Sequence, residues 1–465
     1  MRHDPVLVVG TTPDYAAKIH KRYPETTCFV LDARFRDDAL LESIDESALI
    51  FTPLENVEET LPSVHRYLCD NRLSPQGVAC FDCESLIIAS RLALQLGKPF
   101  PPTEAIIKTR NKFESRRIWT AVGLPSPCAT IASGLGETLE FFRRVKKDIV
   151  IKPVSGSGSE LLFHCENEEE VVRSVQIMEE ELPKRKSNPL FRPIPNTSRA
   201  TPLDPCRSWI AEEFVCGHEF SCDFILENGR ITILRETGKV KAPGQTFGSI
   251  LAYTFPPSYP ERFSLENLTH VLKVAASSLG FTWGHFMVDY IIRNGQPVLI
   301  EMTPRPGGDS LPELVEIATG HDLLGLHLDI VAGKFRPLKV LDIPPEAFAS
   351  INLYAPKGGI ITALDPSPVL SLSWVKAVFL KKNLGDRVIL PPADYDNRLL
   401  GYCIISLQPT WDLLSIYYYL QKLLRVSILD HQHDEKGYDH HKEVDRHLCV
   451  KQAKRVPKSL ISTLH

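Results

Sequence analysis

Short apolar runs alternate with amphipathic stretches over the first hundred residues. The runs predicted as strands are 6–9, 28–31, 49–51 and 77–81. The stretches with helical spacing of apolar residues are 14–22, 61–69 and 85–96. Strands that alternate with helices are typical of a parallel α/β sheet, so residues 1–106 are predicted to form a Rossmann-like domain. No GxGxxG motif follows the first strand, and we therefore assign no dinucleotide to it.

The pattern changes near Glu104, where a second predicted domain, residues 107–333, begins. It opens with a basic helix over 108–122, followed by a strand, a helix and a strand that ends at Lys152. Residues 183–208 contain six prolines and no periodicity, so they are predicted to be an inserted loop. This insertion is either a lid or a spacer without function.

Further strands are predicted after Gly333, at 349–354, 375–380 and 400–407, with a helix over 411–424. Residues 334–430 are therefore predicted to be a third, α+β domain that closes on the second, in a chain that is otherwise α/β. The last segment, 431–465, is polar and contains six histidines without regular spacing. We favour a solvated tail over a metal site there.

Composition narrows the class of protein. The chain has 465 residues, of which 43% are hydrophobic and 24% charged, which is typical of a globular protein with several domains. A net charge of -4 gives no general attraction to nucleic acid or anionic lipid. No apolar run reaches 18 residues and no signal peptide is evident, so a cytoplasmic location without a membrane span is predicted.

The eleven cysteines are scattered, which favours reduced thiols over a disulfide framework. Cys80-Phe-Asp-Cys83 is either a structural pair or a redox or zinc motif. No second CxxC lies at zinc-finger spacing, and we favour the structural role.

A strand that ends in Lys152 runs into the loop Ser155-Gly156-Ser157-Gly158-Ser159. Glycines let backbone N–H groups approach phosphate oxygens, serines add donors, and the lysine adds charge on a rigid strand. The loop is a candidate phosphate-binding site, although a loop that only connects two elements can have the same composition.

Two strand-like runs over 209–226 are joined through Gly217 and carry Glu212, Glu213 and Glu219. An adenine needs a dry slot with polar groups at its rim, and a ribose needs a carboxylate for its hydroxyls, which Glu219 could supply. A surface hairpin with solvated glutamates explains the same pattern.

The segment 284–309 carries the most specific signal. Asn294-Gly295 marks a hairpin turn, and Asp289 and Glu301 lie about six residues from it, so they can share one face of two paired strands. Two facing carboxylates in an apolar hairpin repel unless a cation lies between them, and Mg²⁺ suits such a site. Thr303 and Arg305 follow at alternate positions and point to the same face.

Together these segments resemble the ATP-grasp superfamily over residues 107–333. The N-terminal part is similar to carboxylase-like members through Asp82, Glu84, Leu92-Ala-Leu-Gln-Leu-Gly-Lys-Pro and Gly123-Leu-Pro-Ser-Pro127. The resemblance implies an ATP-grasp fold with ATP and one or two Mg²⁺ ions, or Mn²⁺, as cofactors. The residues that it implies for ATP are Lys112, Lys152, Gly156, Ser157, Gly158, Ser159, Glu212, Glu213, Phe214, Val215 and Glu219.

The resemblance also implies that Asp289, Glu301 and Thr303 hold the metal and that Arg305 neutralises the transferred phosphate. Members usually have glutamate where this chain has Asp289 and asparagine where it has Thr303. Aspartate is one methylene shorter, so the number of bound metal ions stays open.

The implied reaction is activation of a small carboxylate as an acyl phosphate, followed by amide formation with an amine. Pro306-Gly307-Gly308-Asp309 resembles dipeptide-forming amino-acid ligases, so Gly307, Gly308 and Asp309 are candidate substrate-binding residues. Biotin-dependent carboxylases and formate-dependent purine enzymes continue differently after the shared arginine and are the alternatives. Residues 235–253, which include Lys239 and Lys241, either contact substrate or are solvated.

A hypothesis of another class is a regulatory protein that binds ATP without turnover, although both carboxylates and Arg305 are present here. The predicted partners are a small carboxylate and an amine. Homodimerisation is an expectation from the family alone.

Overall fold

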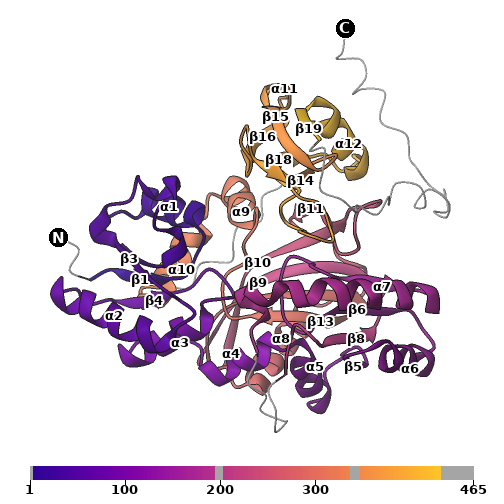
Figure 1. Ribbon diagram of the computed structural model, residues 1–465, viewed down its shortest axis with the longest axis horizontal. Coiled ribbons are helices and arrows are strands. Elements are labelled where there is room, and N and C mark those ends of the chain that lie inside the picture. The colour runs from indigo at the N-terminus through magenta and orange to yellow at the C-terminus, as the bar shows by residue number, and fades with distance from the viewer. Residues whose placement is uncertain (1–3, 194–202, 336–345, 431–465) are drawn as a thin grey trace.

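The computed structural model describes residues 4–193, 203–335 and 346–430. The chain begins with a four-stranded parallel sheet in the order β3-β2-β1-β4 (Figure 1). Its strands are β1 (Val6–Val9), β2 (Thr27–Asp32), β3 (Leu49–Thr52) and β4 (Gly77–Ala79). The helices between them are α1 (Pro13–Arg22), α2 (Val57–Asp70) and α3 (Leu86–Gln95). The strands pair in parallel, so the predicted parallel α/β arrangement of this part is confirmed. β1 and β2 are apolar along almost their whole length and buried on both faces, as strands of a parallel sheet usually are.

The single helix predicted over 108–122 is wrong. The chain forms α4 (Thr103–Arg110) and α5 (Lys112–Ala121), with a break at Asn111. Asn111 has extended backbone angles, and its side chain accepts a hydrogen bond of 3.1 Å from the backbone N–H of Glu114. An asparagine in this conformation ends one helix and caps the next.

A second, antiparallel sheet has the order β5-β8-β6-β7. Its strands are β5 (Ala129–Ala132), β6 (Ile149–Pro153), β7 (Phe163–Cys165) and β8 (Trp209–Glu213), with helices α6 (Leu135–Val145) and α7 (Glu168–Glu181). The start of the predicted proline-rich loop is not irregular, because it forms the short helices η4 (Leu182–Ser187) and η5 (Pro189–Phe191). Leu190 and Phe191 are buried in the core of this sheet. Residues 194–202 of that loop lie outside the described residues.

The third sheet has eight strands in the order β13-β12-β9-β10-β11-β14-β18-β16. They are β9 (His218–Glu227), β10 (Arg230–Lys241), β11 (Ile250–Phe255), β12 (Trp283–Arg293), β13 (Gln296–Thr303), β14 (Ala347–Tyr354), β16 (Val375–Leu380) and β18 (Leu399–Leu407). β11 pairs with β14 in antiparallel fashion, so one sheet crosses the boundary predicted at residues 333 and 334. The domain division itself remains a prediction.

Three helices follow strands of this sheet: α8 (Leu265–Leu279), α9 (Leu311–Thr319) and α10 (Leu323–Val331). α8 packs in the central core, whereas Leu324, Leu328 and Val331 of α10 pack in the core of the N-terminal sheet. Figure 1 shows α10 beside β1 and β4. A helix from the end of the predicted central domain thus packs against the N-terminal sheet.

The C-terminal part adds a small sheet in the order β17-β15-β19 and two helices. These elements are β15 (Gly359–Asp365), α11 (Ser367–Leu370), β17 (Arg387–Val388), α12 (Leu413–Leu423) and β19 (Arg425–Leu429). The strands and the helix predicted over 349–424 are confirmed. The histidine-rich segment 431–465 lies outside the described residues. Among the helices that the structure describes, none is long and apolar enough to cross a membrane.

Candidate active site

The predicted acidic hairpin is formed by β12 and β13. Asp289 and Glu301 are direct register partners, and a bulge follows Asp289. The turn has positive φ angles at Asn294 (55°) and Gly295 (79°), as a tight hairpin turn of this kind requires. The sequence therefore predicted the pairing of the two carboxylates correctly.

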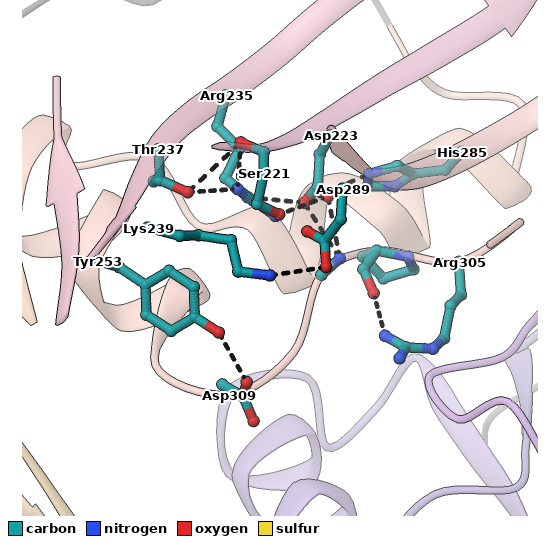
Figure 2. A network of polar contacts seen from close by, with 12 residues as sticks. Ser221, Asp223, Arg235, Thr237, Lys239, Tyr253, His285, Asp289, Arg305 and Asp309 are labelled. Carbon is teal, nitrogen blue, oxygen red and sulfur yellow. Dashed lines mark hydrogen bonds and ion pairs between the residues drawn. The ribbon is translucent and has the colours of Figure 1, made fainter. Parts of the chain in front are cut away.

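Each of these two carboxylates is paired with a lysine. The Lys239 ammonium on β10 lies 2.8 Å from Asp289 and 2.8 Å from Glu219, and Lys241 lies 3.4 Å from Glu219. Figure 2 shows Lys239 pointing at Asp289. The Lys112 ammonium lies 3.7 Å from Glu301. The three carboxylates predicted for metal and ribose, on β9, β12 and β13, thus face lysines on β10 and α5.

Among these three acids Asp289 alone has a raised pKa, whereas the pKa values of Glu219 and Glu301 are lowered. Burial raises the pKa of Asp289; Lys239 opposes this shift, whereas Glu301 and Glu219 add to it. Burial also raises the pKa of Glu219, but Lys239 and Lys241 overcome it and leave that pKa below its usual value. A divalent cation would relieve the repulsion around Asp289, and oxygen ligands from two carboxylates suit Mg²⁺. The donor set therefore fits the predicted metal.

An excess of positive charge lies beside these acids. Lys152 on β6 and Arg116 on α5 share the buried carboxylate of Glu212, with 3.1 Å from Arg116 Nε to Glu212. The pKa of Lys152 is lowered to about 8, mainly by burial and also by Arg116 and Lys112, while Glu212 opposes the shift. Two cations on one carboxylate also hold the pKa of Glu212 below its usual range. An anion such as a phosphate would neutralise the surplus.

The Gly/Ser loop lies between this cluster and the C-terminal part of the chain. Lys112 donates a hydrogen bond of 2.8 Å to the carbonyl of Gly156, and Ser159 Oγ donates one of 3.0 Å to the carbonyl of Gly248. Gly158 has φ +67°, and a Cβ placed on it would lie 2.8 Å from a carboxylate oxygen of Asp396. Ser157 and Gly158 are exposed, so the tip of the loop is free to contact a ligand.

The predicted adenine segment, Glu212 to Val215, is the end of β8 and the residues after it. The backbone N–H groups of Glu213 and Phe214 donate to the carbonyls of Cys128 (2.8 Å) and Asp148 (2.9 Å). The side chain of Glu213 pairs with Lys147 at 2.6 Å and Arg293 at 3.4 Å. The side chains of Glu212 and Glu213 are thus used in ion pairs, and Val215 is buried.

The loop after β13, which contains the predicted substrate-binding residues, contacts a buried ion pair. Asp223 on β9 and Arg235 on β10 are fully buried and 2.9 Å apart, and Asp223 accepts hydrogen bonds of 3.1 Å from the backbone N–H of Gly307. A Cβ on Gly307 would lie 2.3 Å from the Arg235 guanidinium, so only glycine fits there. Asp309 has φ +54° and accepts a hydrogen bond of 3.1 Å from the Tyr253 hydroxyl (Figure 2).

Arg305 reaches from this loop to the N-terminal domain. Its Nε donates to Cys83 Sγ at 3.1 Å, and its Nη1 donates to the Pro306 carbonyl at 2.7 Å. The carbonyl of Thr303 accepts a hydrogen bond of 2.9 Å from the Arg305 backbone N–H. Thr303 is the register partner of Met287 at the end of β13, one residue pair beyond the Val288–Met302 pair.

Sequence reasoning missed Arg116 and Asp223, the pairing of Arg235 with Asp223, and the contact of Cys83 with Arg305. The sequence leaves Lys239 either at the substrate or solvated, and the structure places it against Asp289 and Glu219. One signal could have found part of the set. Arg235, Thr237, Lys239 and Lys241 alternate along β10, and a period of two on a strand puts them on one face.

Comparison with known proteins agrees with this geometry. Residues 145–313 match the family model described as "ATP-grasp domain", so this part of the chain is an ATP-grasp domain. An uncharacterized protein of Sinorhizobium fredii, y4rH, is 25% identical over 237 residues, or 51% of this chain and 44% of that protein. Dapdiamide A synthase of Enterobacter agglomerans is 26% identical over 175 residues, or 37% of this chain and 36% of that protein. The matches span less than half the length of these relatives.

Among solved structures, an L-amino acid ligase from Bacillus licheniformis has a TM-score of 0.70 at 18% identity. The match covers 92% of this chain and 100% of that one. At this identity the likeness shows the fold, and the predicted ATP-grasp fold is confirmed along nearly the whole chain.

Proposed function

We propose that this chain is an ATP-dependent carbon–nitrogen ligase that activates the carboxylate of an amino acid or related small molecule and joins it to an amine. One observation carries the proposal: the opposed carboxylates Asp289 and Glu301 lie beside a surplus of positive charge within an ATP-grasp domain. A site that pairs clustered acids with unneutralised cations suits a metal ion and a polyphosphate bound together.

The nucleotide would lie between the two antiparallel sheets. Strands β6 and β8 of the four-stranded sheet would be on one side of it, and strands β10 and β12 of the eight-stranded sheet on the other. We assign Lys112, Lys152 and the loop 156–159 to the phosphates, and Glu212 to Val215 to the adenine. Glu219 takes the ribose hydroxyls. Ion pairing of Glu219 with Lys239 and Lys241 supports its ionised state, which is the state that accepts hydrogen bonds from hydroxyls.

Asp289 and Glu301, with Thr303 nearby, would hold Mg²⁺, with Mn²⁺ as an alternative. When bound, the metal supplies positive charge between the phosphate oxygens. Burial raises the pKa of Asp289, and a bound cation beside it would favour the ionised form that coordinates a metal.

The proposed reaction needs no protein nucleophile. A substrate carboxylate oxygen attacks the γ-phosphorus of ATP, the bond from that phosphorus to the bridging oxygen breaks, and ADP leaves. The amine nitrogen then attacks the acyl carbon, the carbon–oxygen bond to phosphate breaks, phosphate leaves, and the nitrogen loses a proton. Lys112, Lys152 and Arg305 neutralise the phosphoryl oxygens, while the protein aligns the reactants, which can lower the barrier by about 7 to 11 kcal/mol.

The loop Gly307 to Asp309 is the proposed contact with the acyl donor. Asp223 fixes its start through the Gly307 N–H, and Tyr253 fixes Asp309, so the loop is rigid at both ends. Two similar proteins are named for amide-forming activities: dapdiamide A synthase and the L-amino acid ligase. These names support an amino acid or related carboxylate as substrate.

The test is incubation of the full chain with Mg²⁺, ATP and pools of amino acids and other small carboxylates. ADP, phosphate and AMP are quantified, and new products are identified by mass. We expect ADP and phosphate release that depends on both an acyl donor and an amine, together with a product mass equal to their sum minus water. Release of AMP and pyrophosphate would contradict the acyl-phosphate route. ATP binding without stimulated cleavage across all pools would favour the regulatory alternative.

A further inference from the structure

The N-terminal domain contributes one side chain to the Arg305 guanidinium. Cys80-Phe-Asp-Cys83 follows β4, at the carboxyl end of the parallel sheet, where ligands of such sheets lie. Its two cysteines differ in their surroundings. Cys80 is buried in the apolar core, and its Sγ donates to the Asp82 carbonyl at 3.3 Å. Cys83 is half-buried, and its Sγ accepts the hydrogen bond of 3.1 Å from Arg305 Nε.

These contacts fix the plane of the guanidinium. A guanidinium is flat, so two hydrogen bonds on different nitrogens define its orientation. Arg305 Nε donates to Cys83 and Nη1 to the Pro306 carbonyl. In the part of the chain that the structure describes, Nη2 has no protein acceptor. Cys83 and Pro306 therefore leave one nitrogen of Arg305 for a ligand.

Charged groups on several elements face the sulfur. Burial raises the pKa of the Cys83 thiol; Arg305 lowers it, and Glu84 and Glu301 raise it. Arg110 at the end of α4 also interacts electrostatically with Cys83. The net shift keeps the group a neutral thiol at neutral pH, in which the sulfur is a weak acceptor.

We propose that Cys83 is a positioning residue that orients Arg305 for phosphoryl transfer, so that the N-terminal domain completes the active site. This proposal rests on the proposed function of Arg305. It also gives a role to a domain that lacks a dinucleotide-binding motif: the end of β4 presents Cys83 to a residue 222 positions later in the chain.

Kinetics with three variants test this role. Cys83→Ala removes the acceptor, Cys83→Ser keeps one, and Cys69→Ala removes an exposed cysteine on α2 as the control. With a substrate pair found active, we expect Cys83→Ala to lower kcat at least about tenfold while the KM for ATP changes less than about twofold. Cys83→Ser should recover most of the lost kcat, and Cys69→Ala should match the wild type. A role in packing alone predicts no rescue by serine and a parallel loss of thermal stability.

Solution NMR tests the contact without requiring turnover. In protein labelled with ¹⁵N-arginine, the Arg305 Nε–H resonance is assigned by its loss in Arg305→Lys. We expect its exchange with water to be slow in the wild type and in Cys83→Ser, and faster in Cys83→Ala. An unchanged resonance and exchange rate in Cys83→Ala would overturn the proposal.

The two experiments separate the two proposals. If the wild type shows no substrate-stimulated ATP cleavage but the Arg305 exchange responds to Cys83→Ala, the proposed function fails while Cys83 still holds Arg305. If turnover is present and Cys83→Ala stays within about twofold of the wild-type kcat, the positioning role is wrong and the proposed function stands.

Discussion

The Lys239 ammonium on β10 lies 2.8 Å from the Asp289 carboxylate on β12, and so reaches across the intervening strand β9. The same ammonium lies 2.8 Å from Glu219, which is its register partner on β9. Three neighbouring strands thus place one buried cation among the carboxylates that we assign to metal and ribose. In the free protein Lys239 supplies charge that a bound metal would also supply, and the two cations should influence each other.

Lys239→Met should therefore make stability depend more strongly on Mg²⁺. Loss of the ammonium leaves Asp289 and Glu219 without their shared partner, and breaking a buried ion pair costs about 3 to 5 kcal/mol. A Mg²⁺ ion held by Asp289 and Glu301 would bind the folded chain alone, so it should restore part of this loss. The measurement is the Mg²⁺-dependent rise in Tm, which we expect to be larger in Lys239→Met than in the wild type. Lys241→Met, which removes a lysine that contacts only Glu219 among these acids, is the control. Equal rises in all three proteins would contradict the assignment.

ATP affinity should weaken as the pH rises through about 8. Burial lowers the pKa of Lys152 to about 8, so its ammonium is charged below that pH and is lost above it. A neutral lysine cannot pair with phosphate, and the Kd for ATP should rise by up to about tenfold per pH unit above 8. Lys152→Arg keeps its charge throughout, so its Kd should be flat over pH 7 to 9. Calorimetric titration of MgATP against both proteins checks this, and parallel profiles would exclude Lys152 as the titrating group.

Asp223→Asn should destabilise the chain by about 3 to 5 kcal/mol, because it leaves the buried Arg235 guanidinium without its counter-charge. Both side chains are fully buried, and the same carboxylate holds the Gly307 N–H. Urea unfolding measures the free energy of unfolding. Glu168→Gln, which breaks an exposed ion pair with Arg143, should cause a much smaller change. Similar losses of unfolding free energy in both variants would contradict a larger stabilising contribution from the buried ion pair.

Arg305→Lys should lower kcat by about 100-fold or more with little change in ATP binding. Lysine keeps the charge but not the planar fork of donors, and loss of one preorganised group at the reacting phosphate costs about 100- to 1,000-fold. Steady-state kinetics and MgATP titration separate the two effects. A variant that binds ATP at least tenfold more weakly at full kcat would assign Arg305 to ground-state binding.

The local sequence pattern predicted those elements whose structure is determined by residues close together in the chain. Asn294-Gly295 and the alternation around it predicted the pairing of Asp289 with Glu301, because a tight turn fixes the register of a hairpin. The break at Asn111 was missed because asparagine within a helical pattern can either continue the helix or cap a new one. Only the fold decides between them.

The partners of the predicted residues could not be predicted. Arg305 and Cys83 are 222 positions apart, and the pairing of Lys239 with Asp289 depends on β9 lying between their strands. The ion pairs that the Glu212 side chain makes with Lys152 and Arg116 could not be predicted either. Such contacts are set by the order of strands and by the packing of sheets and helices on one another, and no local spacing encodes either.

Glu301→Gln tests the central claim most directly. The measurement is substrate-stimulated ADP release at saturating MgATP, with the Kd for MgATP determined on the same preparation. Because glutamine cannot supply the anionic oxygen that the metal needs, we predict turnover reduced at least about 100-fold in a folded variant that still binds nucleotide. Full turnover in Glu301→Gln would contradict the assignment of the Asp289 and Glu301 pair as the metal site of an ATP-dependent ligase.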